Sequence, residues 1–290
     1  MEFTRAFVGD RLDRHRTGCG EQPMITLYHH GSSVCAAKVR LVLAEKSLPW
    51  NGIYIDILRG DQFDPTYRKL NPKAVVPTLI HDGKNIVEST VICDYLDECF
   101  PDPPLKPAEP EGRAAMRLWT KAVDESMHSA CAELTFASCH RYIIGRLSPE
   151  KLAEFLDGTP PISVTAYWQA RKKEIVRQGL AAPGVDRTFR LYDGYLQKME
   201  DTLRQDRWLA GDTFSLADIA MAPYVNRLDM LGMSEMWTGT RPRLTEWFER
   251  FKSRPSFKHS LLDMCPPDLT ADLKTFGTQS WPDVKRLLAA

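Results

Sequence analysis

The 290-residue sequence has no apolar run approaching the roughly 20 residues that a membrane-spanning helix needs. It has no excess of one charge either, because Lys plus Arg and Asp plus Glu both number 38. A balanced chain has no general attraction to nucleic acid or to an anionic membrane, so we predict neither as a partner. Residues 1–23 are rich in arginine but lack the apolar segment of a secretory signal. We expect a disordered or additional extension there, before a fold that begins at Met24.

Cysteine motifs are also missing. The seven cysteines are an odd number, they are scattered, and no two of them form a CxxC motif. This pattern excludes a disulfide framework and a cysteine-based zinc site, and we predict no bound metal. A reducing, cytoplasmic setting is the simplest one for such unpaired thiols.

What the chain does contain is enough apolar sequence, 43% of its residues, for two domains with buried cores. From Met24 onward, strand-like and helix-like patterns alternate. The periodicity predicts a strand over residues 24–30, a helix over 36–48 and a second strand over 50–57, followed by a polar loop.

Two β-rich runs then flank Asp82-Gly83, which is a strong signal for a hairpin. A helix is predicted from Glu88 to Phe100, where apolar residues recur at i, i+3 and i+4. Residues 101–112 contain five prolines and a glycine, so the helix cannot continue through them. We place a linker at residues 105–112.

The second half shows helical periodicity and no convincing strand. We therefore predict an all-helical domain over residues 113–265, interrupted by the proline-containing segment 158–163. Residues 266–290 lack a clear amphipathic stripe until the final DVKRLLAA, and we expect them to pack on the surface as an extension. The clearest helical segments are 113–127, 189–203, 216–231 and 244–251.

The first candidate for chemistry is the turn that contains Ser32 and Ser33, followed two residues later by Cys35. A helix N-terminus favours an anion, so a hydroxyl there can stabilise a bound thiolate, and a cysteine there can have a lowered pKa. The alternative is purely structural, with Ser33 as a helix cap and Cys35 as a small buried apolar residue.

Two further motifs are ambiguous when each is taken alone. Val76-Pro77 marks a strand edge, and a cis bond there would present the backbone of Val76 to an extended peptide. Glu88-Ser89 can cap a helix or can bind the ammonium and carboxylate of an α-amino acid. In contrast, Ser215 and Asp218 fit a capping box, which is a folding feature.

The segments LYHHGSSVCAAKVRL, LNPKAVVPTL, DGK-x-x-x-ES and FSLADIA, in this order, resemble the glutathione S-transferase superfamily over roughly residues 24–260. The resemblance implies an α/β domain of thioredoxin-like topology (β-α-β-α-β-β-α) at residues 24–104, followed by an all-α domain. It also implies glutathione as cofactor, with Ser33 activating its thiol and Ser32 in the same turn. Val76 would then pair with the cysteinyl backbone of glutathione, next to a cis Pro77.

By the same resemblance, Glu88 and Ser89 hold the γ-glutamyl end of glutathione. Many relatives carry a polar or basic residue where this sequence has Val75. A contact to the glycine end would therefore either be missing or come from Lys73 or Lys69.

Two narrower resemblances compete. The first is to bacterial β-etherases of lignin catabolism, and it lies in HDGKNIVESTVICDYLDECFP, RAAMRLWTKAVDE and the region from GTPPIS to WQARK, which are similar to those enzymes. Where the etherase turn has Asn and Ser, this sequence has Cys35 and Ala36. The second is to reductive dehalogenases of chlorinated hydroquinones, which are similar in Ser33-Val34-Cys35, KAVVPTL and RLDMLGM. In those enzymes a protein thiol resolves a glutathionyl intermediate, and Cys35 occupies the position of that thiol. The same segments also resemble zeta-type transferases and animal relatives with little reported transferase activity.

The expected activity is attack of the glutathione thiolate on an aromatic electrophile. A reductive reaction that uses Cys35, or a silent ligand-binding role, are the alternatives. The electrophile is expected between the domains, where ligand pockets are common. The family resemblance also implies a homodimer. The candidate lining residues, each of which can instead be core, are Trp119, Met127, His128, Tyr142, Trp168 and Arg171.

Overall fold

A four-stranded sheet forms the centre of the N-terminal domain in the computed structural model, which describes residues 24–289. The extension predicted at residues 1–23 lies outside the described residues. β1 and β2 run parallel, while β3 is antiparallel to both β1 and β4, which gives the spatial order β2-β1-β3-β4. The strands are β1 (Ile25–His29), β2 (Asn51–Tyr54), β3 (Thr78–His81) and β4 (Lys84–Val87).

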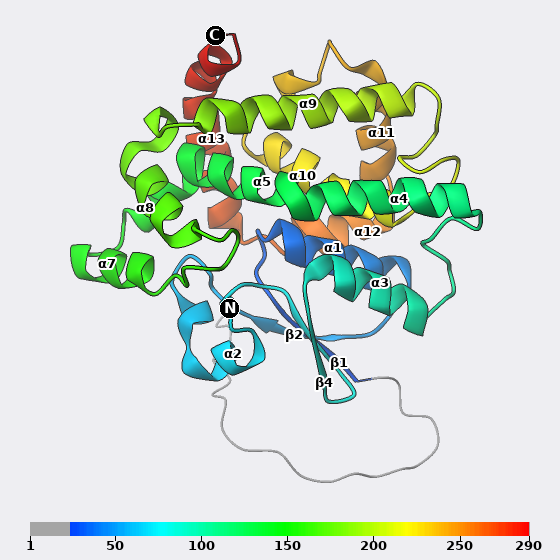
Figure 1. Cartoon of the computed structure of the whole chain (residues 1–290), viewed down its shortest axis with the longest axis horizontal. Helices are drawn as coiled ribbons and strands as arrows, with labels where there is room; N and C mark the ends of the chain where they lie inside the picture. The colour runs from blue at the N-terminus through cyan, green and yellow to red at the C-terminus, as the bar shows by residue number, and fades with distance from the viewer. Residues whose placement is uncertain (1–23, 290) are drawn as a thin grey trace.

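Three helices complete this domain: α1 (Val34–Glu45), α2 (Pro65–Leu70) and α3 (Ser89–Cys99). The order β1-α1-β2-α2-β3-β4-α3 confirms the thioredoxin-like topology. α1 and α3 lie between the sheet and the second domain (Figure 1). Helix α2 falls where the residue pattern alone indicated a loop; it begins at Pro65, after Asp64 accepts a hydrogen bond from the backbone N–H of Thr66 at 2.7 Å.

The Asp82-Gly83 hairpin is confirmed. Asp82 and Gly83 have φ angles of 48° and 77°, the left-handed values that a two-residue turn of this kind requires. β3 and β4 pair from Thr78 opposite Val87 to His81 opposite Lys84. The Val76-Pro77 peptide bond at the start of this hairpin is cis.

The second domain contains only helices as regular elements among the described residues. α4, α5 and α6 follow one another through π-helical turns at residues 123–127 and 136–140, and so form one interrupted rod. The helices are α4 (Pro110–Ala122), α5 (His128–Thr135), α6 (Arg141–Ile144), α7 (Pro149–Asp157), α8 (Trp168–Gln178), α9 (Val185–Leu203), α10 (Leu216–Met230), α11 (Pro242–Lys252), α12 (Pro255–Phe257) and α13 (Pro267–Ala289).

Two boundaries differ from those predicted. α4 begins at Pro110, inside the proposed linker 105–112, because proline is well tolerated in the first helical turn. Within the segment predicted as a surface extension, residues 267–289 form a helix, α13, whose Leu273 and Val284 are fully buried. Gly277 and Pro282 obscure the helical pattern of this segment in the sequence, yet Gly277 is needed because a Cβ there would overlap the carbonyl of Leu231.

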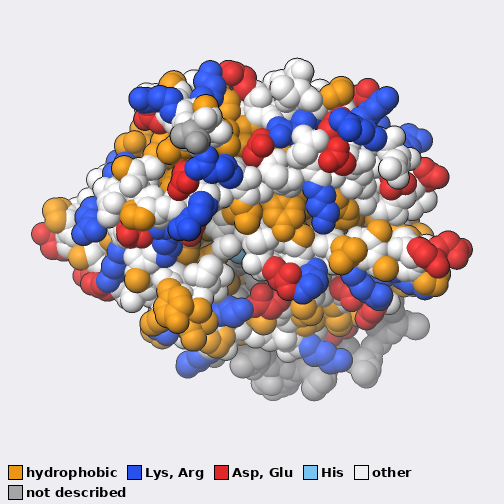
Figure 2. Space-filling model, turned by 45° about the horizontal axis from the view of Figure 1, so that its top comes forward, with side chains coloured by type: hydrophobic (Ala, Val, Ile, Leu, Met, Phe, Trp, Pro, Cys, Tyr) orange, Lys and Arg blue, Asp and Glu red, His pale blue; other side chains and the backbone are white. Residues whose placement is uncertain are grey.

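One apolar core joins the two domains, and α1 packs directly against α10. No helix among residues 24–289 combines the length and the apolar character needed to cross a bilayer. On the face shown in Figure 2, lysine and arginine side chains alternate with aspartate and glutamate, and no large area carries one sign of charge. The balanced charge of the sequence is therefore also balanced locally on this face.

Candidate functional site

The turn between β1 and α1 is fixed by two buried arginines. Arg40 donates to the carbonyls of His30 and Gly31, both at 3.1 Å, and Arg227 on α10 donates to the carbonyl of Ser32. The backbone N–H of Ser32 donates to Nδ1 of His30 at 3.3 Å, so that ring nitrogen is an acceptor. Ser32 is thus held within the turn, and the turn sets the position of the next residue, Ser33.

Ser33 is the N-cap of α1, as a structural role would require. Its Oγ accepts the backbone N–H of Ala36 at 3.2 Å. That bond uses an oxygen lone pair and leaves the hydroxyl proton free to be donated to a ligand. Ser33 also lines a cavity between the domains, so capping and thiolate stabilisation can be combined in one side chain.

The backbone of Val76 is suited to strand addition. Its N–H and C=O have no hydrogen-bond partner among the described residues, because pairing in β3 begins only at Thr78. Val76 lines the same cavity as Ser33. An extended peptide beside Val76 would satisfy both groups.

Glu88 and Ser89 lie at the start of α3, and Glu88 has the unusual φ angle of 69°. Such a backbone conformation in a residue other than glycine is often found at functional sites. Its carboxylate accepts a hydrogen bond from Lys73 Nζ at 2.7 Å. The structure therefore pairs two residues that were predicted to bind opposite ends of glutathione, and both remain about half exposed.

The cavity that contains Ser33 and Val76 has a volume of about 140 Å³ and lies between the domains. Residues 158–167 of the helical domain cover one side, where Ser163 Oγ donates to the carbonyl of Lys73 at 3.0 Å. A larger groove of about 870 Å³ adjoins the cavity and shares Leu58 and Phe63 with it, but neither Ser33 nor Val76 lines this groove. The smaller cavity is therefore the candidate site for a second substrate.

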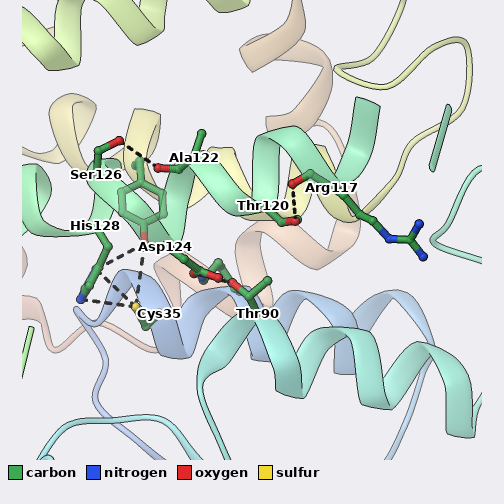
Figure 3. Close-up of polar contacts among 10 residues, drawn as sticks. Cys35, Thr90, Arg117, Thr120, Ala122, Asp124, Ser126 and His128 are labelled. Carbon is green, nitrogen blue, oxygen red and sulfur yellow. Dashed lines mark hydrogen bonds and ion pairs between the residues drawn. The ribbon is translucent and has the colours of Figure 1, made fainter. Parts of the chain in front are cut away.

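Cys35 lies beside this cavity, in contact with the helical domain (Figure 3). Its Sγ is 3.3 Å from Nδ1 of His128 and 3.8 Å from Oη of Tyr224. His128, the first residue of α5, follows the π-helical turn at residues 123–127 and also lines the cavity. π-helical turns are frequent at functional sites, and this one places an imidazole next to a thiol.

These contacts change the pKa values of both Cys35 and His128. Burial raises the pKa of the Cys35 thiol, but the charges of His128 and Lys38, with hydrogen bonds from His128 and Ser89, lower that pKa to about 6. Burial lowers the pKa of His128, and the Cys35 thiolate outweighs this effect and raises it. The two groups together favour a thiolate–imidazolium pair.

Lys38 is held near this pair by a network that links the domains. Its Nζ donates to Thr90 Oγ1 at 3.1 Å. Thr90 Oγ1 in turn donates to Asp124 Oδ1 at 2.7 Å (Figure 3). Asp124 belongs to the same π-helical turn that precedes His128. The network therefore connects α1 and α3 with the segment that positions the imidazole.

Of the six residues predicted to line the electrophile pocket, two do so: His128 and Trp168. The other four lie outside the lining. Trp119 and Met127 are buried in the core, Tyr142 stacks on Phe276 at 4.9 Å between ring centroids, and Arg171 forms a two-pronged bond with Glu133. Helical spacing indicates which residues share a buried face, but it does not show whether that face packs in the core or lines a cavity.

Among the lining residues that were not predicted are two cations, Lys172 and Arg227, both almost fully buried. Lys172 shares a helical face with Trp168 and Ile175, at spacings of four and three residues, and this is the one signal that marks it in the run Arg171-Lys172-Lys173. Arg227 lies on α10, which is buried on nearly all sides, so no polar face distinguishes it.

Comparisons with known proteins agree with this geometry. The chain matches the glutathione S-transferase N-terminal domain over residues 27–104 and the corresponding C-terminal domain over residues 182–250. It is 32% identical to protein LigF of Sphingobium sp. strain SYK-6, over 81% of this chain and 91% of that protein. It is 29% identical to the tetrachloro-p-hydroquinone reductive dehalogenase of Sphingobium chlorophenolicum, over 81% and 95% of the two chains. The crystal structure of β-etherase LigF superimposes with a TM-score of 0.74 at 31% identity, covering 82% of this chain and 98% of that one.

Proposed function

Because the chain belongs to the glutathione S-transferase family, we propose that it transfers the thiolate of glutathione to an aromatic electrophile bound between its domains. The observation that carries the proposal is the position of Ser33: its hydroxyl stands at the N-terminus of α1, keeps a free proton and faces the interdomain cavity. Val76 offers unpaired backbone groups to the cysteinyl residue of glutathione, and Glu88 and Ser89 receive the γ-glutamyl end.

The reaction requires a thiolate at neutral pH. A free thiol has a pKa of about 8.5, and each tenfold increase in the ratio of thiolate to thiol corresponds to about 1.4 kcal/mol. A hydrogen bond from Ser33 to the charged sulfur supplies about 1.5–3 kcal/mol, and the helix dipole adds to it. The thiol proton leaves to solvent, a carbon–sulfur bond forms, and the leaving group departs with the electron pair of the broken bond.

Cleavage of β-aryl ethers is the form of this reaction supported by the similarity to LigF. There the leaving group is a phenolate, which takes up a proton from solvent. By the resemblance described above, Cys35 and Ala36 stand where the etherase turn has Asn and Ser, so Ser33 would supply the hydroxyl that stabilises the thiolate.

The Cys35–His128 contact favours a second candidate, reductive dehalogenation of a chlorinated hydroquinone. Glutathione first displaces chloride. The Cys35 thiolate then attacks the sulfur of the conjugate, so a mixed disulfide forms and the ring carbon keeps the electron pair and gains a proton. A second glutathione reduces the mixed disulfide, which yields oxidised glutathione and the free Cys35 thiol.

We further propose a cytoplasmic homodimer. The six described cysteines are all unpaired thiols, which suits a reducing compartment. Val91 on α3 and Leu118 on α4 are apolar side chains that are 55% and 62% exposed, which would be covered in a dimer. Light scattering measures the mass directly, and a monomer in solution would contradict the dimer.

Calorimetric titration with reduced glutathione tests the proposed site. Wild-type protein should show saturable one-site binding, and Ser89→Ala and Glu88→Gln should weaken it by about tenfold, the effect of losing one hydrogen bond of about 1.4 kcal/mol. Glu98→Gln is the matched control, because Glu98 is an exposed acid on the same helix that pairs with Lys106. Absence of binding at millimolar glutathione would instead indicate a ligand-binding protein without turnover.

A further inference from the structure

Two cations line the interdomain cavity without an acidic partner. Lys172 and Arg227 are 4% and 3% exposed, and neither forms an ion pair with any residue in the described part of the chain. Lys172 Nζ donates to Thr159 Oγ1 at 3.0 Å. Arg227 uses one nitrogen for the carbonyl of Ser32, and its Nε and Nη1 have no partner among the described residues.

The other buried lysines and arginines of the described residues have hydrogen-bond or ion-pair partners. Lys46 pairs with Asp97 at 2.7 Å and also donates to two backbone carbonyls. Arg40 donates to carbonyls from three different nitrogens. A buried charge without a partner is strongly unfavourable, so the exceptions, Lys172 and Arg227, call for a ligand that completes them.

Aromatic rings surround Lys172 but do not neutralise it. Its Nζ lies 3.8 Å from the ring centroid of Phe155 and 5.3 Å from that of Phe136. Such contacts stabilise a cation in part and leave its net charge in place. On the same cavity wall, His140 is buried and its Nε2 has no hydrogen-bond partner among residues 24–289.

The rest of the cavity suits one aromatic ring. Phe63, Phe136 and Trp168 contribute apolar walls, and the volume of about 140 Å³ is close to that of protein cavities that hold a benzene molecule. Ser33 lines the same cavity, so a ring held there is next to the position proposed for the glutathione sulfur.

We propose that the electrophile is a single-ring aromatic compound that carries a carboxylate or phenolate group, and that Lys172 and Arg227 bind this group. The proposal rests on the transferase function in one respect: that function makes the occupant of the cavity a substrate. The anionic group enters the buried end of the cavity, and the reacting carbon remains toward Ser33. The glycyl carboxylate of glutathione is another anion that the same two cations can bind.

Binding of unreactive ligands tests the site without turnover. The whole protein is titrated calorimetrically with dinitrobenzoate and with dinitrobenzene, at a pH near 6 so that Lys172, whose pKa burial lowers to about 7, is charged. We expect wild-type protein to bind dinitrobenzoate at least about tenfold more tightly than dinitrobenzene. Lys172→Met should abolish this preference. Lys173→Met should retain it, because Lys173 lies next in the helix and pairs with Asp157 at the surface.

Equal affinity of wild-type protein for the two ligands would overturn the proposal. So would a Lys172→Met variant that keeps the preference for dinitrobenzoate but loses affinity for glutathione, since the anion held by Lys172 would then be the glycyl carboxylate. Turnover is measured separately with chlorodinitrobenzoate and glutathione. If the binding preference is present and no conjugate forms, the transferase function fails while the anion site stands.

Discussion

The Sγ atom of Cys35 lies 3.3 Å from Nδ1 of His128, although 93 residues separate the two in the sequence. The thiol comes from the first turn of α1 in one domain and the imidazole from the start of α5 in the other. Docking of the two domains therefore creates the pair. It also places a readily ionised thiol two residues from Ser33, so the chain has two candidate groups for sulfur chemistry within one helical turn.

The thiolate character of Cys35 can be measured through its rate of alkylation. Because its pKa is lowered to about 6, the rate with iodoacetamide should rise with pH around 6 and be level at neutral pH. His128→Gln removes the cation while burial continues to raise the pKa, so the midpoint should move above about 8. Mass spectrometry assigns the modified residue, with the exposed Cys99 as an internal reference. An unchanged midpoint in His128→Gln would show that the imidazole does not stabilise the thiolate.

Cys35→Ser separates the two candidate reactions. Thioether formation with chlorodinitrobenzene depends on Ser33, so this variant should keep its rate. With a chlorinated hydroquinone, the variant should stop after chloride displacement and accumulate the glutathionyl conjugate, because the attacking thiol is gone. Cys99→Ser is the control, since Cys99 is exposed at the end of α3. Formation of dechlorinated product by Cys35→Ser at the wild-type rate would exclude Cys35 from the reaction.

Much of the fold was predictable because its signals are local. The Asp82-Gly83 turn and the capping box of Ser215 and Asp218 are determined by residues within four positions of each other. Helix α13 was not predictable, because Gly277 and Pro282 are unfavourable in an isolated helix and only the close approach of α13 to Leu231 explains the glycine.

The site was predictable in its N-terminal half and not in its C-terminal half. Ser33 and Val76 stand in motifs with fixed spacing, and both line the interdomain cavity. Arg171 and Lys172 are adjacent in the sequence but differ in their surroundings. Arg171 pairs with Glu133 outside the cavity lining, whereas Lys172 lines the cavity. Which side of α8 faces the cavity depends on how α7 and the segment 158–167 fold over it, and that is tertiary information.

The capping box of α10 should contribute strongly to stability. Asp218 is fully buried and accepts hydrogen bonds from the backbone of Leu209 and Ser215, both at 3.0 Å, and from the indole of Trp247 at 2.8 Å. Asp218→Ala leaves these three donors buried without an acceptor, so the free energy of unfolding should fall by about 3 kcal/mol or more. Ser215→Ala loses the cap bond to Ala217 and should cost about 1 kcal/mol. Urea unfolding measures both, and equal losses in the two variants would refute the central role of the carboxylate.

Lys172 should make stability depend on pH in an unusual direction. Burial lowers its pKa from 10.5 to about 7 in the folded protein, so between these values the unfolded chain binds the extra proton. The contribution of Lys172 to the free energy of unfolding should therefore rise with pH, by up to about 1.4 kcal/mol per pH unit between these two values. Below pH 7 both states are protonated, and the full penalty of the buried charge remains.

Lys172→Met removes that penalty and preserves much of the side-chain volume. The variant should be more stable than wild type near pH 6, and the difference should shrink as the pH approaches 10, which urea unfolding at several pH values measures directly. Lys173→Met, on the same helix but paired with Asp157 and 43% exposed, should differ from wild type by a small amount that is constant over this range. A stability gain of Lys172→Met that stays constant from pH 6 to 10 would mean that Lys172 keeps its proton in the folded protein throughout. The aromatic rings of Phe155 and Phe136 would then have to offset the whole cost of burying the ammonium.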